Sequence, residues 1–165
     1  MAAHFIEERR TPALERRLAL GFIAGFIAVL LFHQPTLAFL NYIGFTHAGT
    51  YSFKAVAPFG VPQVISLAFW GGVWGVLFAA VDRRFPRGNL YWLYAFAFGA
   101  IFPTLVAWFI VAPLKGLPLA GGWEAHRMIT GLLINGAWGI GTALLLALAY
   151  RLRVRQWPSE LAKPL

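Results

Sequence analysis

The residues of this chain that could do chemistry are mostly neutral and lie within long apolar stretches. We single out eight polar side chains inside those stretches: His33, Gln34, Gln63, Ser66, Thr104, Thr130, Asn135 and Thr142. Amides, hydroxyls and imidazoles can hydrogen-bond a neutral ligand or one another, and a polar group removed from water is costly unless it is paired. These positions are therefore the first places to look for a site.

One candidate site follows from the depth and helical spacing of these residues. We expect a small outward-opening cavity that holds a ligand or passes a small solute, lined by five ligand-binding candidates: His33, Gln34, Trp70, Asn135 and Trp138. The alternative, which the sequence favours, is that these residues bond one another across helices and only fix packing, at under about 1 to 2 kcal/mol per bond. Asn135 is expected to matter in either case.

Other chemistry finds little support in the sequence. The chain has no cysteine, glycine-rich phosphate loop, paired carboxylates or H-E-x-x-H motif, so we predict no catalytic residue, metal ligand or cofactor, and we do not expect an enzyme. A bis-histidine heme would need His33 and His126. Because His126 stands beside Glu124 and Arg127, a solvated loop histidine is the ordinary expectation there. A heme or quinone protein is thus the least favoured hypothesis.

The elements that carry these residues are predicted to be membrane spans. Only 12% of the 165 residues are charged, against about 25% in an ordinary soluble domain. Four stretches of 23 or more residues carry no Lys, Arg, Asp or Glu, and roughly 20 apolar residues are enough to cross a bilayer. We predict an all-α integral membrane protein, a four transmembrane helix bundle with these spans: about 18–40, 62–81, 90–112 and 128–150.

The spans are expected to form one domain with short flanking segments. Residues 1–17 are predicted to be a cytoplasmic amphipathic segment with a helix start at Thr11, residues 18–150 the transmembrane domain, and residues 151–165 a basic cytoplasmic tail. A cleaved signal peptide over residues 1–38 is the alternative. The apolar stretch is longer than a usual signal-peptide core and is interrupted by polar and proline residues, so a retained first span is favoured.

The distribution of cations predicts how the chain is threaded. Eleven of the 14 Lys and Arg residues flank the spans on one side, and the other side holds only Lys54, Lys115 and Arg127. Short loops rich in Lys and Arg stay cytoplasmic, so both termini are predicted to be cytoplasmic. The net charge of +8 is then expected to meet anionic lipids at the cytoplasmic face of the bilayer, and no nucleic acid is expected as a partner.

Small residues four apart predict how the helices pack. Helices in lipid associate by close backbone approach. Every predicted span carries such a pair, and we single out Gly21 and Gly25, Gly71 and Gly75, Ala95 and Gly99, and Ala137 and Gly141. Two prolines, Pro35 and Pro103, are expected to kink the first and third spans because each removes a backbone hydrogen bond.

The two halves of the chain also echo each other. The segment Gly72-Val73-Trp74-Gly75 is followed 64 positions later by Gly136-Ala137-Trp138-Gly139. Each half would be one helix up, an Ala-Pro turn and one helix down, which gives two parallel helix-hairpin repeats related by an axis along the membrane normal. Short matches of this kind also arise by chance in a chain rich in Gly and Trp, so both interpretations stay open.

Four segments together carry a resemblance to a known group. They are Pro58-Phe59-Gly60-Val61-Pro62, Phe69-Trp70-Gly71-Gly72-Val73-Trp74-Gly75, Ala112-Pro113-Leu114-Lys115-Gly116-Leu117-Pro118 and Leu133-Ile134-Asn135-Gly136-Ala137-Trp138-Gly139. Over residues 18–150 the chain resembles a group of small four-span inner-membrane proteins predicted in proteobacteria. That group has no assigned activity, so the resemblance implies a bacterial inner (plasma) membrane and nothing about substrate or catalysis.

Two functions therefore compete. The favoured hypothesis is a non-enzymatic component that packs with itself, as a homo-oligomer, or with a partner membrane protein. The alternative is a small transporter or channel for a neutral or lipid-like solute, which the internal repeat and the polar residues in the outer half of the spans would serve.

Overall fold

The structure is a computed structural model that describes residues 2–155, with side chains described from residue 14 to residue 151. Its helices and strands follow in this order: α1 (Ala2–Ala28), the π-helix η1 (Val29–His33), α2 (Gln34–Tyr42), the strands β1 (Ala55–Val56) and β2 (Val61–Pro62), α3 (Gln63–Val81), the 3-10 helix η2 (Asp82–Arg84), α4 (Asn89–Val106), the π-helix η3 (Ala107–Val111), α5 (Ala112–Leu114), the 3-10 helix η4 (Leu119–Trp123) and α6 (Ala125–Arg155). The two short strands pair antiparallel in a small hairpin.

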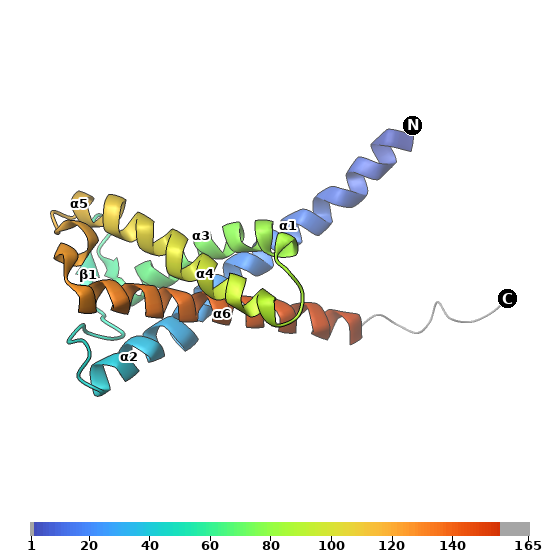
Figure 1. The fold of residues 1–165 in the computed structure, drawn as a ribbon. Coiled ribbons are helices and arrows are strands. Elements are labelled where there is room, and N and C mark those ends of the chain that lie inside the picture. The colour runs from blue at the N-terminus through green and yellow to red at the C-terminus, as the bar shows by residue number, and fades with distance from the viewer. Residues whose placement is uncertain (1, 156–165) are drawn as a thin grey trace.

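Four helical runs are long and apolar enough to cross a membrane: Leu14–Tyr42, Gln63–Arg84, Asn89–Leu114 and Ala125–Arg151. They pack into an all-α four-helix bundle (Figure 1), which confirms the predicted fold class, and the length and composition of the four helices are those of a multi-pass membrane protein.

The first helix is longer than the sequence predicted. α1 begins at Ala2 and continues through Pro12 without a break, so the helix start predicted at Thr11 is wrong: the helix begins well before the apolar span, which starts at Leu14. The residues before Thr11 are rich in Ala, Glu and Arg, which are strong helix formers and outweigh one lost hydrogen bond at the proline. The last ten residues of the predicted tail, 156–165, lie outside the described residues.

The bundle has two ends. At the terminal end, α1 enters the bundle, α3 passes into η2 and α6 leaves the bundle; the loop end carries α2, the β1–β2 hairpin, α5 and η4 (Figure 1). The first span crosses the other three obliquely in this view.

Helices α1 and α3 approach each other through four glycines. Gly21 lies against the carbonyl of Gly75, and Gly25 lies against the carbonyl of Gly71, so that a Cβ at these positions would overlap backbone atoms. Such contact between backbones is how helices associate in lipid. These are the four glycines that the sequence singled out for packing in the first two spans.

Helices α4 and α6 meet in the same manner. Gly99 lies against the carbonyl of Asn135, and Gly139 lies against the carbonyl of Ala95. On α6 the close approach is therefore made at Gly139, because 100° per residue places it on the same face as Asn135. The pair predicted for this span lies elsewhere: Gly141 packs against the ring of Phe32 in η1, and Ala137 is half-buried.

The two helical hairpins, α1–α3 and α4–α6, use equivalent packing contacts. When α1 is aligned with α4 by adding 74 to the residue number, Gly21 and Gly25 correspond to Ala95 and Gly99. When α3 is aligned with α6 by adding 64, Gly75 corresponds to Gly139. A phenylalanine ring covers a glycine at matching positions of both hairpins, Phe22 over Gly72 and Phe96 over Gly136. Each hairpin is thus packed by the same geometry.

The hairpins join each other in two different ways. α1 packs directly against α6, whereas α3 and α4 are bridged by aromatic rings. The ring of Phe98 on α4 stands edge-to-face on Phe78 of α3, with ring centroids 5.3 Å apart at 90°, and also contacts Trp74. Phe78 is fully buried and belongs to the core cluster with Ala95 and Leu146.

The first and third spans each contain a π-helix followed by a proline. η1 precedes Pro35, and η3 precedes Pro113. A π-helix shifts the hydrogen bonds by one residue, which accommodates a residue that cannot donate one. The third span was predicted to be disturbed at Pro103, but α4 runs through that residue and the irregular segment follows it.

Candidate functional site

The side chains that the sequence proposed as one site lie in separate places, the first of which is Gln34 at the end of η1. The backbone N–H of Gln34 bonds to the carbonyl of Val29. The carbonyl of Leu30 therefore loses the partner it would have in an α-helix, and Pro35 has no N–H to replace it. The hydroxyl of Tyr51, from the loop before α3, donates to that Leu30 carbonyl at 2.7 Å.

Gln34 also holds the same loop through its side chain. Its Oε1 accepts a hydrogen bond from the backbone N–H of Tyr51 at 2.8 Å, and the residue is only 2% exposed. Tyr51 has a φ of +47°, a left-handed conformation that is uncommon for a residue other than glycine, and these two hydrogen bonds hold it there. His33 is buried beside Gln34, with its Nδ1 3.5 Å from Nε2 of that side chain.

The loop continues from Tyr51 onto the start of α3. The carbonyl of Ser52 accepts from the N–H of Val64, and the carbonyl of Lys54 accepts from the N–H of Gln63, both at 2.9 Å. The first N–H groups of a helix have no partner within the helix, so residues 51–54, which we call the strap, cap α3. The strap thus ties the first span to the second at the loop end.

Asn135 lies at a second place, between α4 and α6. Its Nδ2 donates to the hydroxyl of Thr104 on α4 at 2.8 Å, and that hydroxyl lies 3.4 Å from the carbonyl of Gly131 on α6. Thr104 is 1% exposed and Asn135 is half-buried. The amide therefore joins the two helices of the second hairpin.

Trp138 lies at a third place and joins the two hairpins. Its indole Nε1 donates to the carbonyl of Gly25 on α1 at 2.9 Å, and its own carbonyl accepts from the hydroxyl of Thr142 at 2.9 Å. Trp138 is 2% exposed. An indole N–H buried in an apolar setting needs an acceptor, and the close glycine packing of α1 leaves the Gly25 carbonyl within reach.

Trp70 does not join the other four candidates. It is 59% exposed on the outer surface of α3, where its ring packs edge-to-face on Phe69. The structure therefore brings Gln34 and His33 together and places Asn135, Trp138 and Trp70 elsewhere. Four of the five, His33, Gln34, Asn135 and Trp138, hydrogen-bond neutral groups of the bundle, whereas Trp70 only packs its ring on Phe69.

The second histidine of the hypothetical heme pair lies on the surface. His126 is about half exposed at the start of α6, with Nε2 3.5 Å from the carboxylate of Glu124. Arg127 places its Nε 3.2 Å from the same carboxylate. His126 is therefore held in a loop-end ion-pair cluster, while His33 is buried in the first span.

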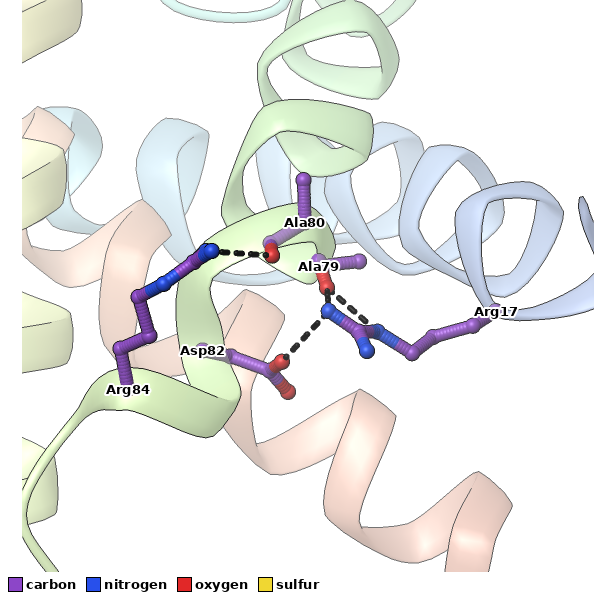
Figure 2. A network of polar contacts seen from close by, with 5 residues as sticks. All are labelled: Arg17, Ala79, Ala80, Asp82 and Arg84. Carbon is purple, nitrogen blue, oxygen red and sulfur yellow. Dashed lines mark hydrogen bonds and ion pairs between the residues drawn. The ribbon is translucent and has the colours of Figure 1, made fainter. Parts of the chain in front are cut away.

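A charged pair that sequence analysis missed lies at the terminal end. The guanidinium of Arg17 on α1 donates through Nε and Nη2 to the carbonyl of Ala79 near the end of α3, and its Nη2 lies 3.5 Å from Oδ1 of Asp82 (Figure 2). The two charged side chains are 10% and 7% exposed. The neighbouring Arg84 turns back toward the carbonyl of Ala80 at 3.4 Å.

The sequence did contain a signal for this pair. Asp82 directly follows the charge-free stretch of the second span, and Arg17 directly precedes that of the first. Antiparallel spans bring the start of one and the end of the next to the same level, so opposite charges at those two positions can meet. Both residues also belong to the charge pattern that predicts the topology, and that pattern by itself does not specify a pair.

In comparisons with known proteins, no family model, no curated protein and no solved structure matches the chain. The resemblance to small four-span proteins of proteobacteria therefore stays a prediction.

Proposed function

We propose that the protein is a non-enzymatic component of a bacterial inner membrane that packs with copies of itself or with a partner membrane protein. The observation that carries this proposal is how the deep polar side chains are used. Gln34, Asn135 and Trp138 each hydrogen-bond another part of the same bundle. Polar groups engaged in this way hold helices together, at about 0.6 kcal/mol on average for a bond between membrane helices.

The outer surface of α4 supports the assembly part of the proposal. Only 28% of the most apolar part of the third span is buried in the bundle, against 39% for each of the other three. Large apolar side chains cover this surface, Leu93, Ile101, Phe102 and Leu105, and Phe109 in η3 continues it. Because lipid tails are as apolar as leucine, an apolar surface does not by itself favour a protein neighbour over lipid. The third span is the one that leaves the largest share of its surface for contact with another helix.

The arrangement of cations supports the proposed orientation. Exposed arginines surround the terminal end: Arg16, Arg83, Arg84, Arg87 and Arg151. We place this end at the cytoplasmic face, where anionic lipid phosphates would meet these side chains.

Cross-linking tests the proposal directly, since a chain without cysteine has no background reaction. We would place a single cysteine on α4 by Phe102→Cys and compare it with Ile23→Cys on α1, because both positions are 52% exposed. With a bifunctional maleimide in native membranes, the α4 variant should give a product and the control should give much less. A product of twice 18.3 kDa indicates self-assembly, and any other mass indicates a partner.

The proposal would be abandoned if cysteines on the outer faces of all four spans gave no cross-link and the protein were strictly monomeric in mild detergent.

The second candidate function is a small transporter or channel for a neutral or lipid-like solute. The observation that favours it is the matching packing of the two hairpins, since parallel repeats are one of the plans on which transporters are built. In liposomes that contain the protein, urea or glycerol should then enter faster than in empty liposomes, and Asn135→Leu should abolish the difference. Equal entry into empty and protein-containing liposomes would remove this candidate.

A further inference from the structure

Exposed charges stand at both ends of the second span. At the terminal end, the exposed Arg83 and Arg84 follow α3 directly. At the loop end, the carbonyl of Lys54 accepts from the N–H of Gln63, and the side chain of Lys54 is exposed. Between these two levels α3 has 19 residues, or about 28 Å at 1.5 Å per residue. The hydrocarbon core of a bilayer is roughly 30 Å thick, so the strap lies where hydrocarbon gives way to lipid headgroups.

The β1–β2 hairpin is held at this level by both of its ends. β1 begins directly after Lys54, and β2 ends directly before Gln63. Phe59, in the turn between the two strands, is 86% exposed, and Phe53 in the strap is 75% exposed. Two phenyl rings are thus presented to the surroundings at the depth where the headgroups begin, which is where the apolar side chains of interfacial segments lie.

Charge at the loop end is complementary to phospholipid. Each of the two loops there carries an exposed lysine directly after an exposed apolar side chain: Lys54 follows Phe53, and Lys115 follows Leu114. The only acid in residues 43–62 and 115–124 is Glu124, which is already engaged in an ion pair. A lysine near the end of a span extends its ammonium to the interface while its apolar stem lies along the hydrocarbon. The lysines are therefore available to lipid phosphates.

We propose that the strap and the β1–β2 hairpin form a phospholipid-binding surface in the leaflet at the loop end. The rings of Phe53 and Phe59 lie among the headgroups and the first acyl carbons, and the ammonium of Lys54 lies at a lipid phosphate. This surface fixes the depth of the second span, which at 22 residues is the shortest of the four. The proposal requires only that the four helices cross a bilayer, and it is independent of the proposed assembly and of the side that the loop end faces.

Spin labels on single cysteines test the proposal, because the chain has no cysteine. Phe53→Cys and Phe59→Cys would be labelled separately in liposomes of phosphatidylcholine and phosphatidylglycerol. Molecular oxygen concentrates in lipid, whereas a neutral nickel chelate stays in water. At both positions, replacing the nickel chelate by oxygen should increase the collision rate several-fold.

Gly49→Cys is the matched control, since Gly49 is also exposed and lies farther from the bilayer centre. The side chain of Asn41 donates to the carbonyl of the neighbouring Ala48 at 3.2 Å. Asn41 lies about 10 Å further along α2 than Gln34, whose side chain holds the strap. The label at Gly49 should therefore collide more often with the nickel chelate than with oxygen.

Two results would overturn the proposal. Labels at Phe53 and Phe59 that meet the nickel chelate as often as the label at Gly49 would place the hairpin in water. Labels shielded from both reagents would place it against protein, such as a second copy of the chain. Because the two positions are labelled in separate variants, one variant that fails to fold leaves the other decisive. Cross-linking through α4 reads a different surface, so the proposed assembly can fail or succeed separately.

A charge reversal tests the contact between Lys54 and phosphate. In the variant labelled at Phe59, Lys54→Glu places a carboxylate beside the phosphates, and collisions with the nickel chelate should increase as the hairpin is repelled. Lys115→Glu makes the same change in net charge in the other loop, and it should leave the label at Phe59 unaffected. Equal effects of the two reversals would refute the assigned contact of Lys54.

Discussion

The indole Nε1 of Trp138 donates a hydrogen bond to the carbonyl of Gly25 at 2.9 Å, across 113 positions of the sequence. This bond joins the two hairpins at their closest contact, between α1 and α6. Trp74 occupies the equivalent position in the first hairpin and packs its ring on Phe98, with centroids 6.4 Å apart. The two hairpins are therefore alike in their internal packing and different in how they meet.

Replacing Trp138 should weaken the contact between the hairpins. Trp138→Phe removes the donor to the Gly25 carbonyl, and it should destabilise the protein by about 0.6 to 1.7 kcal/mol and lower the Tm by a few degrees. Trp70→Phe is the control, because Trp70 lies on the outer surface. The Tm of both variants is measured in the same detergent. Equal decreases in Tm would mean that the hydrogen bond from the Trp138 indole does not stabilise the protein.

A methyl group at Gly75 should separate α1 from α3. A Cβ there would overlap the carbonyl of Gly21 and lie 2.9 Å from the Cα of Gly25, and these backbone atoms cannot rotate away. Gly75→Ala should therefore cost about 1 to 3 kcal/mol. Gly49→Ala provides the comparison, since nothing lies within 4 Å of its Cβ position. The prediction fails if both variants unfold at the same temperature.

Removing the Tyr51 hydroxyl should loosen the strap. Tyr51→Phe leaves the Leu30 carbonyl without its donor, and because this contact is exposed the loss should cost about 0.5 to 1.5 kcal/mol. The loop between the first two spans should then be cut faster in limited proteolysis, and the Tm should fall. Tyr42→Phe serves as the reference because Tyr42 is 89% exposed. Identical cutting rates would show that the Leu30 carbonyl is satisfied in another way.

Reporter fusions should place both termini on the cytoplasmic side. Four spans return the chain to the side from which it started, and the excess of Lys and Arg predicts which side that is. A fluorescent protein that matures only in the cytoplasm should fluoresce at either terminus, and alkaline phosphatase fused after Gly49 should be active. An active phosphatase at either terminus would contradict the orientation.

The number of spans and the class of fold could be predicted from composition along the chain. Whether a helix can cross a bilayer depends on its length and its lack of charge, which are local properties. The glycines Gly21, Gly25, Gly71 and Gly75 could be singled out as well, because contact between backbones in lipid requires small residues four apart. The true start of the first helix at Ala2 was not predicted, because the helix propensity of the residues before Thr11 outweighed the effect of Pro12.

Which polar groups meet was decided by the tertiary structure. The partner of Gln34 is Tyr51 in a loop, the partner of Arg17 is Asp82 in η2 at the end of the second span, and the partner of Trp138 is a backbone carbonyl of α1. The contacts of Arg17 and Trp138 depend on how one helix is rotated against another, and the contact of Gln34 with the Tyr51 loop is accompanied by a bond to the Leu30 carbonyl that the π-helix leaves free. The sequence alone determined that the chain is built from four apolar helices; the contacts between them settled which side chains form pairs, because such contacts join residues up to 113 positions apart.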